Sequence, residues 1–144
     1  MNSSTSFEVP EVVSTAGTTP QNVSQPFLVY FLISKGTGEK IILYLHFTEV
    51  QTLRANDTRE FNIVWDGNII HEAYSPKMLQ SDTKYNILPI TCSKTICFLS
   101  LVRTQRSTLP PLINAIESFR VLEFPYAETN PNDGRLLLLQ TGPN

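Results

Sequence analysis

The chain has 144 residues, which is the size of a single domain built around one hydrophobic core. Hydrophobic residues make up 41% of it and charged residues 17%, and 11 basic residues nearly balance 13 acidic ones. The net charge of −2 and the lack of a basic run argue against nucleic acid or an anionic membrane surface as the main partner. The longest apolar run, residues 41–47, has the length of a strand and is too short to span a bilayer.

The first 25 residues are rich in Ser, Thr and Pro, with one short apolar patch at residues 9–13. We expect residues 1–6 to be mobile and the patch to supply at most one edge strand. The N-terminus has neither the basic nor the apolar region of a secretory signal, so the sequence taken literally is that of a cytosolic protein.

Two strand-sized runs follow, at residues 27–34 and 41–50, and the glycine-containing segment 35–40 predicts a turn between them. In the second run Leu43, Leu45 and Phe47 alternate with Tyr44, His46 and Thr48. This period of two indicates a β-strand with one buried face.

Residues 61–74, FNIVW-DG-NIIHEAY, predict a β-hairpin. Asp66-Gly67 suits a type I′ turn, in which both central residues have positive φ. A two-residue loop pairs Trp65 with Asn68, Ile63 with Ile70, and Phe61 with Glu72. Phe61, Ile63 and Ile70 would then form the buried face.

Cys92 is the last residue of one apolar run, residues 84–92, and Cys97 is the first residue of the next, residues 97–104. This arrangement predicts a further hairpin whose strands a Cys92–Cys97 disulfide would cross-link; two reduced thiols near a turn are the alternative. A metal site is disfavoured because C-x4-C is an unusual ligand spacing and only His46 and His71 could add nitrogen ligands. We expect no metal and no cofactor.

Local pattern does not decide whether residues 107–124 form a helix or a strand. With a period of 3.6 its apolar residues Leu112, Ile113, Ile116 and Phe119 share a helical face, behind Pro110-Pro111 at the first turn. The same residues could instead lead into an extended strand. Six or seven short strands at roughly 10-residue spacing indicate an all-β antiparallel sandwich, and that context favours the strand.

Nothing in the sequence supports an enzyme. No serine has a nucleophile-elbow context, and His46 is expected to be a satisfied or solvent-facing side chain of a strand. A binding module is the natural alternative, because carbohydrate-binding sandwiches stack sugar rings on exposed aromatics. The weak candidates for such contacts are Trp65, Asp66, Tyr74 and Tyr85, for which core or edge packing is the plainer interpretation. Glycosylation sequons at Asn2, Asn22 and Asn56 permit a glycoprotein.

Three motifs carry a resemblance to a known family: LHF-x-E-x-Q-x-L, N-D-T-R-E-F-N-I and S-T-L-P-P-L-I-N-A-I-E. Residues 7–133 resemble the malectin-like ectodomain of plant leucine-rich-repeat receptor-like kinases, in its C-terminal part. The resemblance implies a jelly-roll type β-sandwich in which N-A-I-E is a strand. It also implies an extracellular recognition role on the outer side of the plasma membrane, with carbohydrate or a secreted peptide as ligand and no kinase activity in this chain.

The departures from the family suggest that residues 7–128 form a partial sandwich, incomplete at its N-terminal edge, and that 129–144 are an atypical tail. An open edge could pair with another chain, so a fragment without binding activity, or a strand-pairing partner of a full-length receptor-like kinase, is the alternative function. No direct membrane insertion is expected.

Overall fold

The computed structural model describes residues 2–4, 11–33, 38–92 and 94–122. Its elements, in chain order, are β1 (Asn2–Ser4), α1 (Glu11–Thr15), β2 (Phe27–Leu32), β3 (Glu39–Phe47), β4 (Phe61–Trp65), β5 (Asn68–Tyr74), β6 (Asp82–Tyr85), β7 (Ile90–Cys92), β8 (Ile96–Arg103) and β9 (Ala115–Arg120). The predicted tail 129–144 lies outside the described residues.

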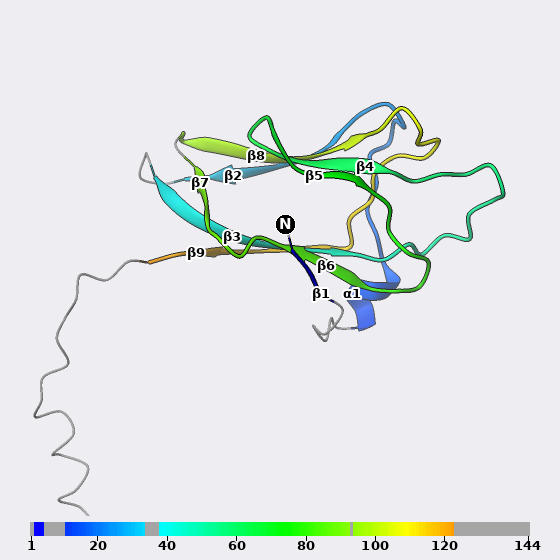
Figure 1. Ribbon diagram of the computed structural model, residues 1–144, viewed down its shortest axis with the longest axis horizontal. Helices are drawn as coiled ribbons and strands as arrows, with labels where there is room; N and C mark the ends of the chain where they lie inside the picture. Colours follow the sequence, from blue (N-terminus) through cyan, green and yellow to red (C-terminus); the bar gives the residue numbers. More distant parts are fainter. Residues whose placement is uncertain (1, 5–10, 34–37, 93, 123–144) are drawn as a thin grey trace, which may run out of the picture.

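The strands form two antiparallel sheets that stack as the two layers visible in Figure 1. One sheet has the order β2-β8-β4-β5. In the other, β6 and β7 pair with successive parts of β3, β1 extends the sheet beyond β6, and β9 pairs with β3. The predicted all-β antiparallel sandwich is confirmed.

Alternation along the strands places one face of each sheet in the core. In β3 the inward residues Leu43, Leu45 and Phe47 are fully buried, as the period of two predicted. The facing sheet contributes Phe61 and Ile63 of β4, also fully buried. This shared apolar layer stabilises the sandwich and fixes which side chains face outward.

The β4–β5 hairpin follows its predicted register only near the turn. Trp65 pairs with Asn68 as expected, and Asp66 and Gly67 have positive φ angles of 45° and 89°. Two register shifts then pair Phe61 with Tyr74 and not with Glu72. The predicted pairing was wrong because bulges turn a large aromatic ring inward where strict alternation would have buried a carboxylate.

The predicted pairing of Ile63 with Ile70 was also wrong. Ile63 pairs with His71, and Ile70 packs, partly buried, against the core. The bulge is supported at Ala73, whose φ is 47° and whose amide donates to Asn62 Oδ1 over 2.9 Å. A side-chain acceptor thus satisfies an amide near the irregular part of the ladder.

One side chain, that of Asn86, completes the backbone hydrogen bonding of β3. Asn86, between β6 and β7, accepts a hydrogen bond from the Leu43 amide at 2.7 Å and donates to the Ile41 carbonyl at 3.1 Å. These bonds replace strand pairing in the interval between the two short ladders, so no gap in backbone hydrogen bonding opens beside buried Leu43.

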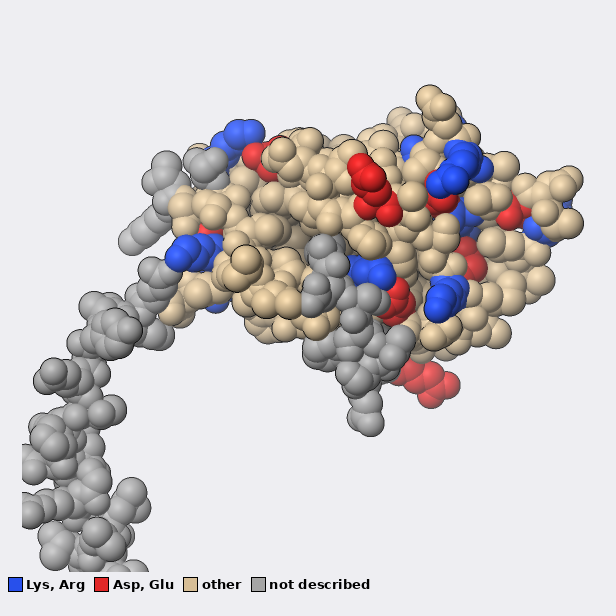
Figure 2. Space-filling model, in the orientation of Figure 1, with Lys and Arg blue, Asp and Glu red and all other residues tan. Residues whose placement is uncertain are grey.

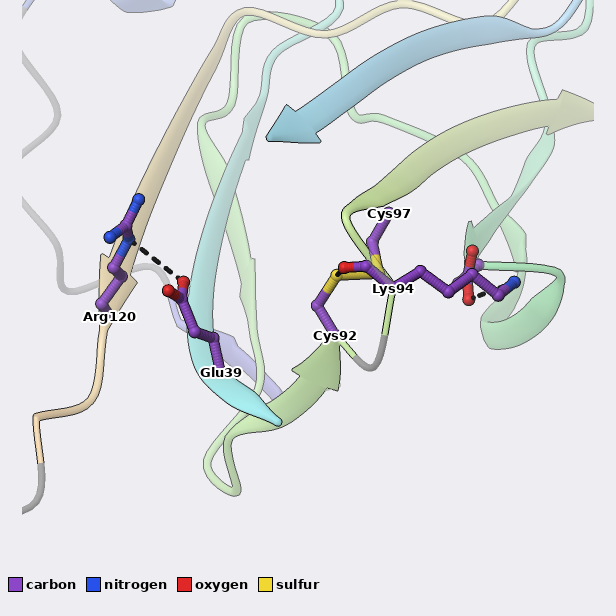
Figure 3. The surroundings of a disulfide bond; sticks show 6 residues. Glu39, Cys92, Lys94, Cys97 and Arg120 are labelled. Carbon is purple, nitrogen blue, oxygen red and sulfur yellow. Dashed lines mark hydrogen bonds and ion pairs between the residues drawn. A yellow bond between two sulfur atoms is a disulfide. The ribbon is translucent and has the colours of Figure 1, made fainter. Parts of the chain in front are cut away.

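The cysteines do not cross-link a hairpin, because β7 and β8 lie in different sheets. β7 pairs with β3, whereas β8 pairs with β2 and β4. Cys92 and Cys97 are bonded and fully buried, with Cα atoms 5.9 Å apart, at the point where the chain crosses between the layers (Figure 3). The bond therefore joins one sheet to the other.

Replacing both cysteines by alanine is expected to lower the free energy of unfolding by about 2 kcal/mol, because the bond closes a short ring in the unfolded chain. Urea denaturation of the double variant and of protein from an oxidising host would measure this, with mass spectrometry to show the loss of two hydrogens on bond formation. Equal denaturation midpoints for the two proteins would contradict a structural role for the bond.

Two elements are described near the N-terminus. Asn2–Ser4, within the segment 1–6 that was expected to be mobile, pair with β6 as β1. Glu11–Thr15 form a short helix where an edge strand was expected. The strand predicted within residues 107–124 is confirmed: Ala115–Arg120 form β9, which pairs along β3.

Candidate functional site

Two of the four sequence candidates are core residues. Trp65 is 5% exposed and packs on Phe31, with ring centroids 5.2 Å apart. Tyr74 is 6% exposed, and its hydroxyl donates to Asp82 Oδ2 at 3.2 Å. Burial, followed by the charge of Asp82, raises the pKa of the Tyr74 phenol far above its ordinary value. Neither ring is open for a sugar to stack on.

The third candidate, Asp66, supports the hairpin turn. Its carboxylate forms an ion pair with Lys94 at 3.0 Å, and its amide donates to the carbonyl of Phe98 at 2.8 Å. Figure 3 shows Lys94 beside the disulfide. Asp66 thus ties the β4–β5 turn to the chain that crosses between the sheets.

The fourth candidate, Tyr85, lies on the outer face of the β1-β6-β3-β9 sheet, half-buried, where it pairs with Tyr44. The two rings are stacked, with centroids 5.6 Å apart and an interplanar angle of 13°. Tyr85 is therefore the sequence candidate that the structure places beside other outward-facing aromatics.

A groove lies next to this pair on the same outer face. It has a volume of about 360 Å³ and is lined by Ile42, Tyr44, Glu117 and Phe119. The Tyr44 and Phe119 rings meet edge to face, at 90° with centroids 5.8 Å apart. Phe119 is 53% exposed, and the Glu117 side chain is 58% exposed. We call these four residues the outer-face groove.

Strand pairing brings the groove together from distant parts of the sequence. β3 and β9 are antiparallel neighbours that set Ile42 opposite Phe119 and Tyr44 opposite Glu117. Residues directly opposite each other in a ladder point to the same face. The sheet itself therefore fixes the spacing of the four side chains.

Beside the groove, on the same face of β3 as Tyr44, His46 contacts Glu117. His46 is buried, with Nδ1 2.9 Å from Thr83 Oγ1 and Nε2 3.5 Å from Glu117 Oε2. It is the satisfied strand histidine that the sequence predicted. It orients one oxygen of the carboxylate and leaves the rest of that side chain facing solvent.

A buried ion pair that sequence analysis did not find lies elsewhere, at one end of the sandwich. Arg59 Nε is 2.6 Å from Glu49 Oε2, and the two side chains are 2% and 1% exposed. Arg59 also donates to Gln51 Oε1 and to the Pro110 carbonyl. These residues come from the three family motifs, so the motifs encode an internal connection between loops.

Glu60, the residue after Arg59, lies in a second cluster of polar side chains. Its carboxylate accepts hydrogen bonds from Thr104 Oγ1 at 2.7 Å and from Arg106. The Thr104 hydroxyl, with the positive charge of Arg106 in support, holds the pKa of Glu60 below its ordinary value despite some loss of solvation.

Glu60→Gln is expected to make stability less dependent on pH. A carboxylate with a lowered pKa stabilises the fold above its ordinary pKa, and this contribution disappears as the pH falls through the lowered value. Thermal melts at about pH 7 and about pH 3 should show a wild-type advantage over the variant that shrinks in acid. An advantage that does not change with pH would contradict the role given to Glu60.

The described parts of the chain offer no cluster of three or more His, Cys, Asp or Glu side chains that could hold a metal ion. Across the same residues, no helix has the length and apolar character needed to cross a membrane. Figure 2 shows a face on which basic and acidic side chains lie close to one another among many uncharged ones.

Two of the three sequon asparagines, Asn22 and Asn56, are exposed loop residues. Asn22 Oδ1 accepts a hydrogen bond from the Ser24 amide at 2.9 Å, which leaves its Nδ2 atom, the site of glycan attachment, uninvolved in that bond. The side chain of Asn2 lies outside what the structure describes. Use of these sequons stays a prediction.

The described residues form an antiparallel β-sandwich with a groove on the outer face of one sheet. The chain belongs to the malectin-like domain family, whose pattern matches residues 1–121. It is 57% identical over 133 residues to the probable LRR receptor-like serine/threonine-protein kinase At2g28960 of Arabidopsis thaliana, covering 92% of this chain and 15% of that protein.

Other relatives carry similar names. The probable LRR receptor-like serine/threonine-protein kinase PAM74 of Arabidopsis thaliana is 42% identical over 127 residues, which are 88% of this chain and 14% of the relative. The chain thus spans about one seventh of such proteins and corresponds to their malectin-like part; no kinase domain is indicated in it. No solved structure matches the chain significantly.

Proposed function

We propose that this chain is an extracellular recognition module that binds carbohydrate or a secreted peptide without catalysing a reaction. Its membership of the malectin-like family supports the proposal, as do relatives whose names describe receptor-like kinases. A receptor must present a ligand surface outside the cell, and a sandwich with one solvated sheet face can supply it.

The outer-face groove is the observation that carries the proposal. It places the half-buried ring of Tyr44 and the exposed ring of Phe119 beside a carboxylate, and these are the groups that ligand sites use for apolar contact and orientation. Among the four lining residues, Tyr44 and Phe119 supply the apolar contact and Glu117 supplies a hydrogen-bond acceptor.

The test is a binding screen with the full chain, secreted from an oxidising host, against cell-wall oligosaccharides and secreted peptides. Tyr44→Ala should weaken binding of any hit about fivefold or more, because one ring contact of this kind contributes on the order of 1 kcal/mol or more. Tyr30→Ala is the matched control, since Tyr30 is 62% exposed on the opposite sheet.

The proposal fails if Tyr44→Ala binds as the wild type does, or if Tyr30→Ala causes the larger loss. Both variants must melt at temperatures close to that of the wild type for the comparison to hold. A melt is needed because Tyr44 also stacks on Tyr85.

A second candidate function is strand pairing with a full-length receptor. Within the described sheets β2 and β9 are edge strands, and a pocket of about 320 Å³ between them is lined by residues of both. Exposed Tyr30 and Leu32 lie on β2. Long apolar edges favour pairing with another chain.

Sedimentation of the full chain with a receptor ectodomain separates this candidate from the first. Strand pairing predicts a complex that Leu32→Lys abolishes, because a charged edge residue opposes pairing. Ligand binding at the outer-face groove predicts no effect of Leu32→Lys on the hits of the binding screen.

A further inference from the structure

We propose that the outer-face groove binds a compact cation, namely the guanidinium or ammonium group of a basic side chain in a peptide ligand. This inference rests on the proposed function, because it specifies the ligand of that same groove. It chooses the peptide over the carbohydrate.

The first argument is the shape of the aromatic lining. The Tyr44 and Phe119 rings stand at 90° to each other, so together they form a corner. Tyr85 stacks on Tyr44 and occupies part of its surroundings. A pyranose ring needs a flat, open aromatic face, whereas a corner of two rings can enclose a small cation.

The second argument is charge. Among the described residues that line the groove, Glu117 is the charged one, and it lies across the β3–β9 ladder from Tyr44. Aromatic ring faces carry negative electrostatic potential and attract a cation within about 6 Å of the ring centre. A carboxylate beside such rings adds Coulomb attraction of the same sign.

Among the described residues, the cations nearest the groove are not part of its lining. Arg120, the next residue of β9, forms an ion pair with Glu39 at 3.3 Å (Figure 3). Lys40 is on the outer face of β3 but lies beyond Ile42, outside the set of lining residues. His46, two residues along β3 from Tyr44, contacts Glu117 at 3.5 Å. One side of the carboxylate is therefore left to face a ligand.

The proposal is tested by NMR titration of the isotope-labelled full chain with three probes at millimolar concentration. The probes are a blocked Gly-Arg-Gly peptide, the same peptide with neutral citrulline in place of arginine, and cellotetraose. The arginine peptide should shift the resonances of Tyr44, Glu117 and Phe119, and the citrulline peptide should bind about fivefold more weakly.

Glu117→Gln should weaken binding of the arginine peptide by about three- to fivefold and leave citrulline binding unchanged. Glu72→Gln is the matched control, because Glu72 is an exposed glutamate on strand β5 of the other sheet. That control should bind all probes as the wild type does.

Each outcome separates the two proposals. If cellotetraose shifts the groove residues and the arginine peptide does not, the cation inference is wrong and the recognition function stands. If the two peptides bind equally, the groove binds peptides without selecting charge, and the inference is overturned. If no probe shifts the groove residues, the cation inference is wrong; shifts at other residues would then also move the proposed recognition surface away from the groove.

Discussion

Replacing Arg59 by methionine is expected to lower the free energy of unfolding by about 3–5 kcal/mol, because the change leaves the carboxylate of Glu49 buried and unpaired. Both side chains are almost completely inaccessible, and Arg59 Nε lies 2.6 Å from Glu49 Oε2. The guanidinium donates hydrogen bonds to three acceptors: Glu49, Gln51 and the Pro110 carbonyl. Its loss would therefore disconnect several loops at once.

Chemical denaturation measures this effect, and the exposed pair of Arg106 with Glu60 supplies the control. The Arg106 side chain is 74% exposed, so Arg106→Met should cost under about 1 kcal/mol. Pairing Arg59→Met with Glu49→Leu should recover much of the loss, since an apolar pair leaves no charge unpaired. Equal costs for Arg59→Met and Arg106→Met would show that the buried pair has no special role.

Phe61→Ala is expected to lower the free energy of unfolding by about 3–5 kcal/mol, the cost of a large cavity in a packed core. Phe61 is fully buried, with ring centroids 5.7 Å from Phe47 and 5.5 Å from Tyr74. The three rings come from strands of both sheets, so the cavity would open at the contact between the layers.

The matched control is Phe119→Ala, the same change at a ring that is 53% exposed. Its cost should be under about 1 kcal/mol, because the exposed half of the ring gains little from folding. Denaturant titration of both variants compares the two sites. A Phe119→Ala protein as unstable as Phe61→Ala would place Phe119 in the core and remove it from the groove.

The sequence predicted the strands well where alternation and turn chemistry agreed. The inward residues of β3 and the Asp66-Gly67 turn follow from local pattern alone. The bulges near Ala73 could not be predicted in this way, because they depend on which ring fills the space beside Phe61 and Phe47. Which ring fills that space is decided by packing in the core, between residues distant in the sequence.

The cysteine segment shows a second limit. Two apolar runs joined by a short connection predict a hairpin, but the same pattern also fits a chain that crosses from one sheet to the other. Cys92 and Cys97 lie at such a crossing. Local pattern has no information on sheet membership, which depends on the partners of each strand.

The groove residues were largely missed for a similar reason. Alternation in β3 already turned Tyr44 outward, and this signal could have marked it as a surface aromatic. Its neighbours Glu117 and Phe119 reach it only through pairing with β9, more than seventy positions along the chain. Trp65 and Tyr74 were chosen for their nearness to predicted turns, and both are buried.

The family motifs were read from the sequence as signs of relatedness, and the structure gives them a physical role. Glu49, Gln51, Arg59 and Pro110 belong to them and meet in one hydrogen-bonded network around the buried Arg59–Glu49 pair. The three motifs therefore contribute to holding the fold together. Ligand contact is expected at the outer-face groove, where Glu117 is the last residue of the third motif and Phe119 lies outside it.

The most direct measurement of the recognition function compares the affinities of wild-type chain and Phe119→Ala for the tightest ligand found in the screen. The two proteins should melt at nearly the same temperature, since Phe119 is half exposed. We expect the variant to bind about tenfold more weakly or worse. Equal affinities in two equally stable proteins would contradict the assignment of the outer-face groove as the ligand surface.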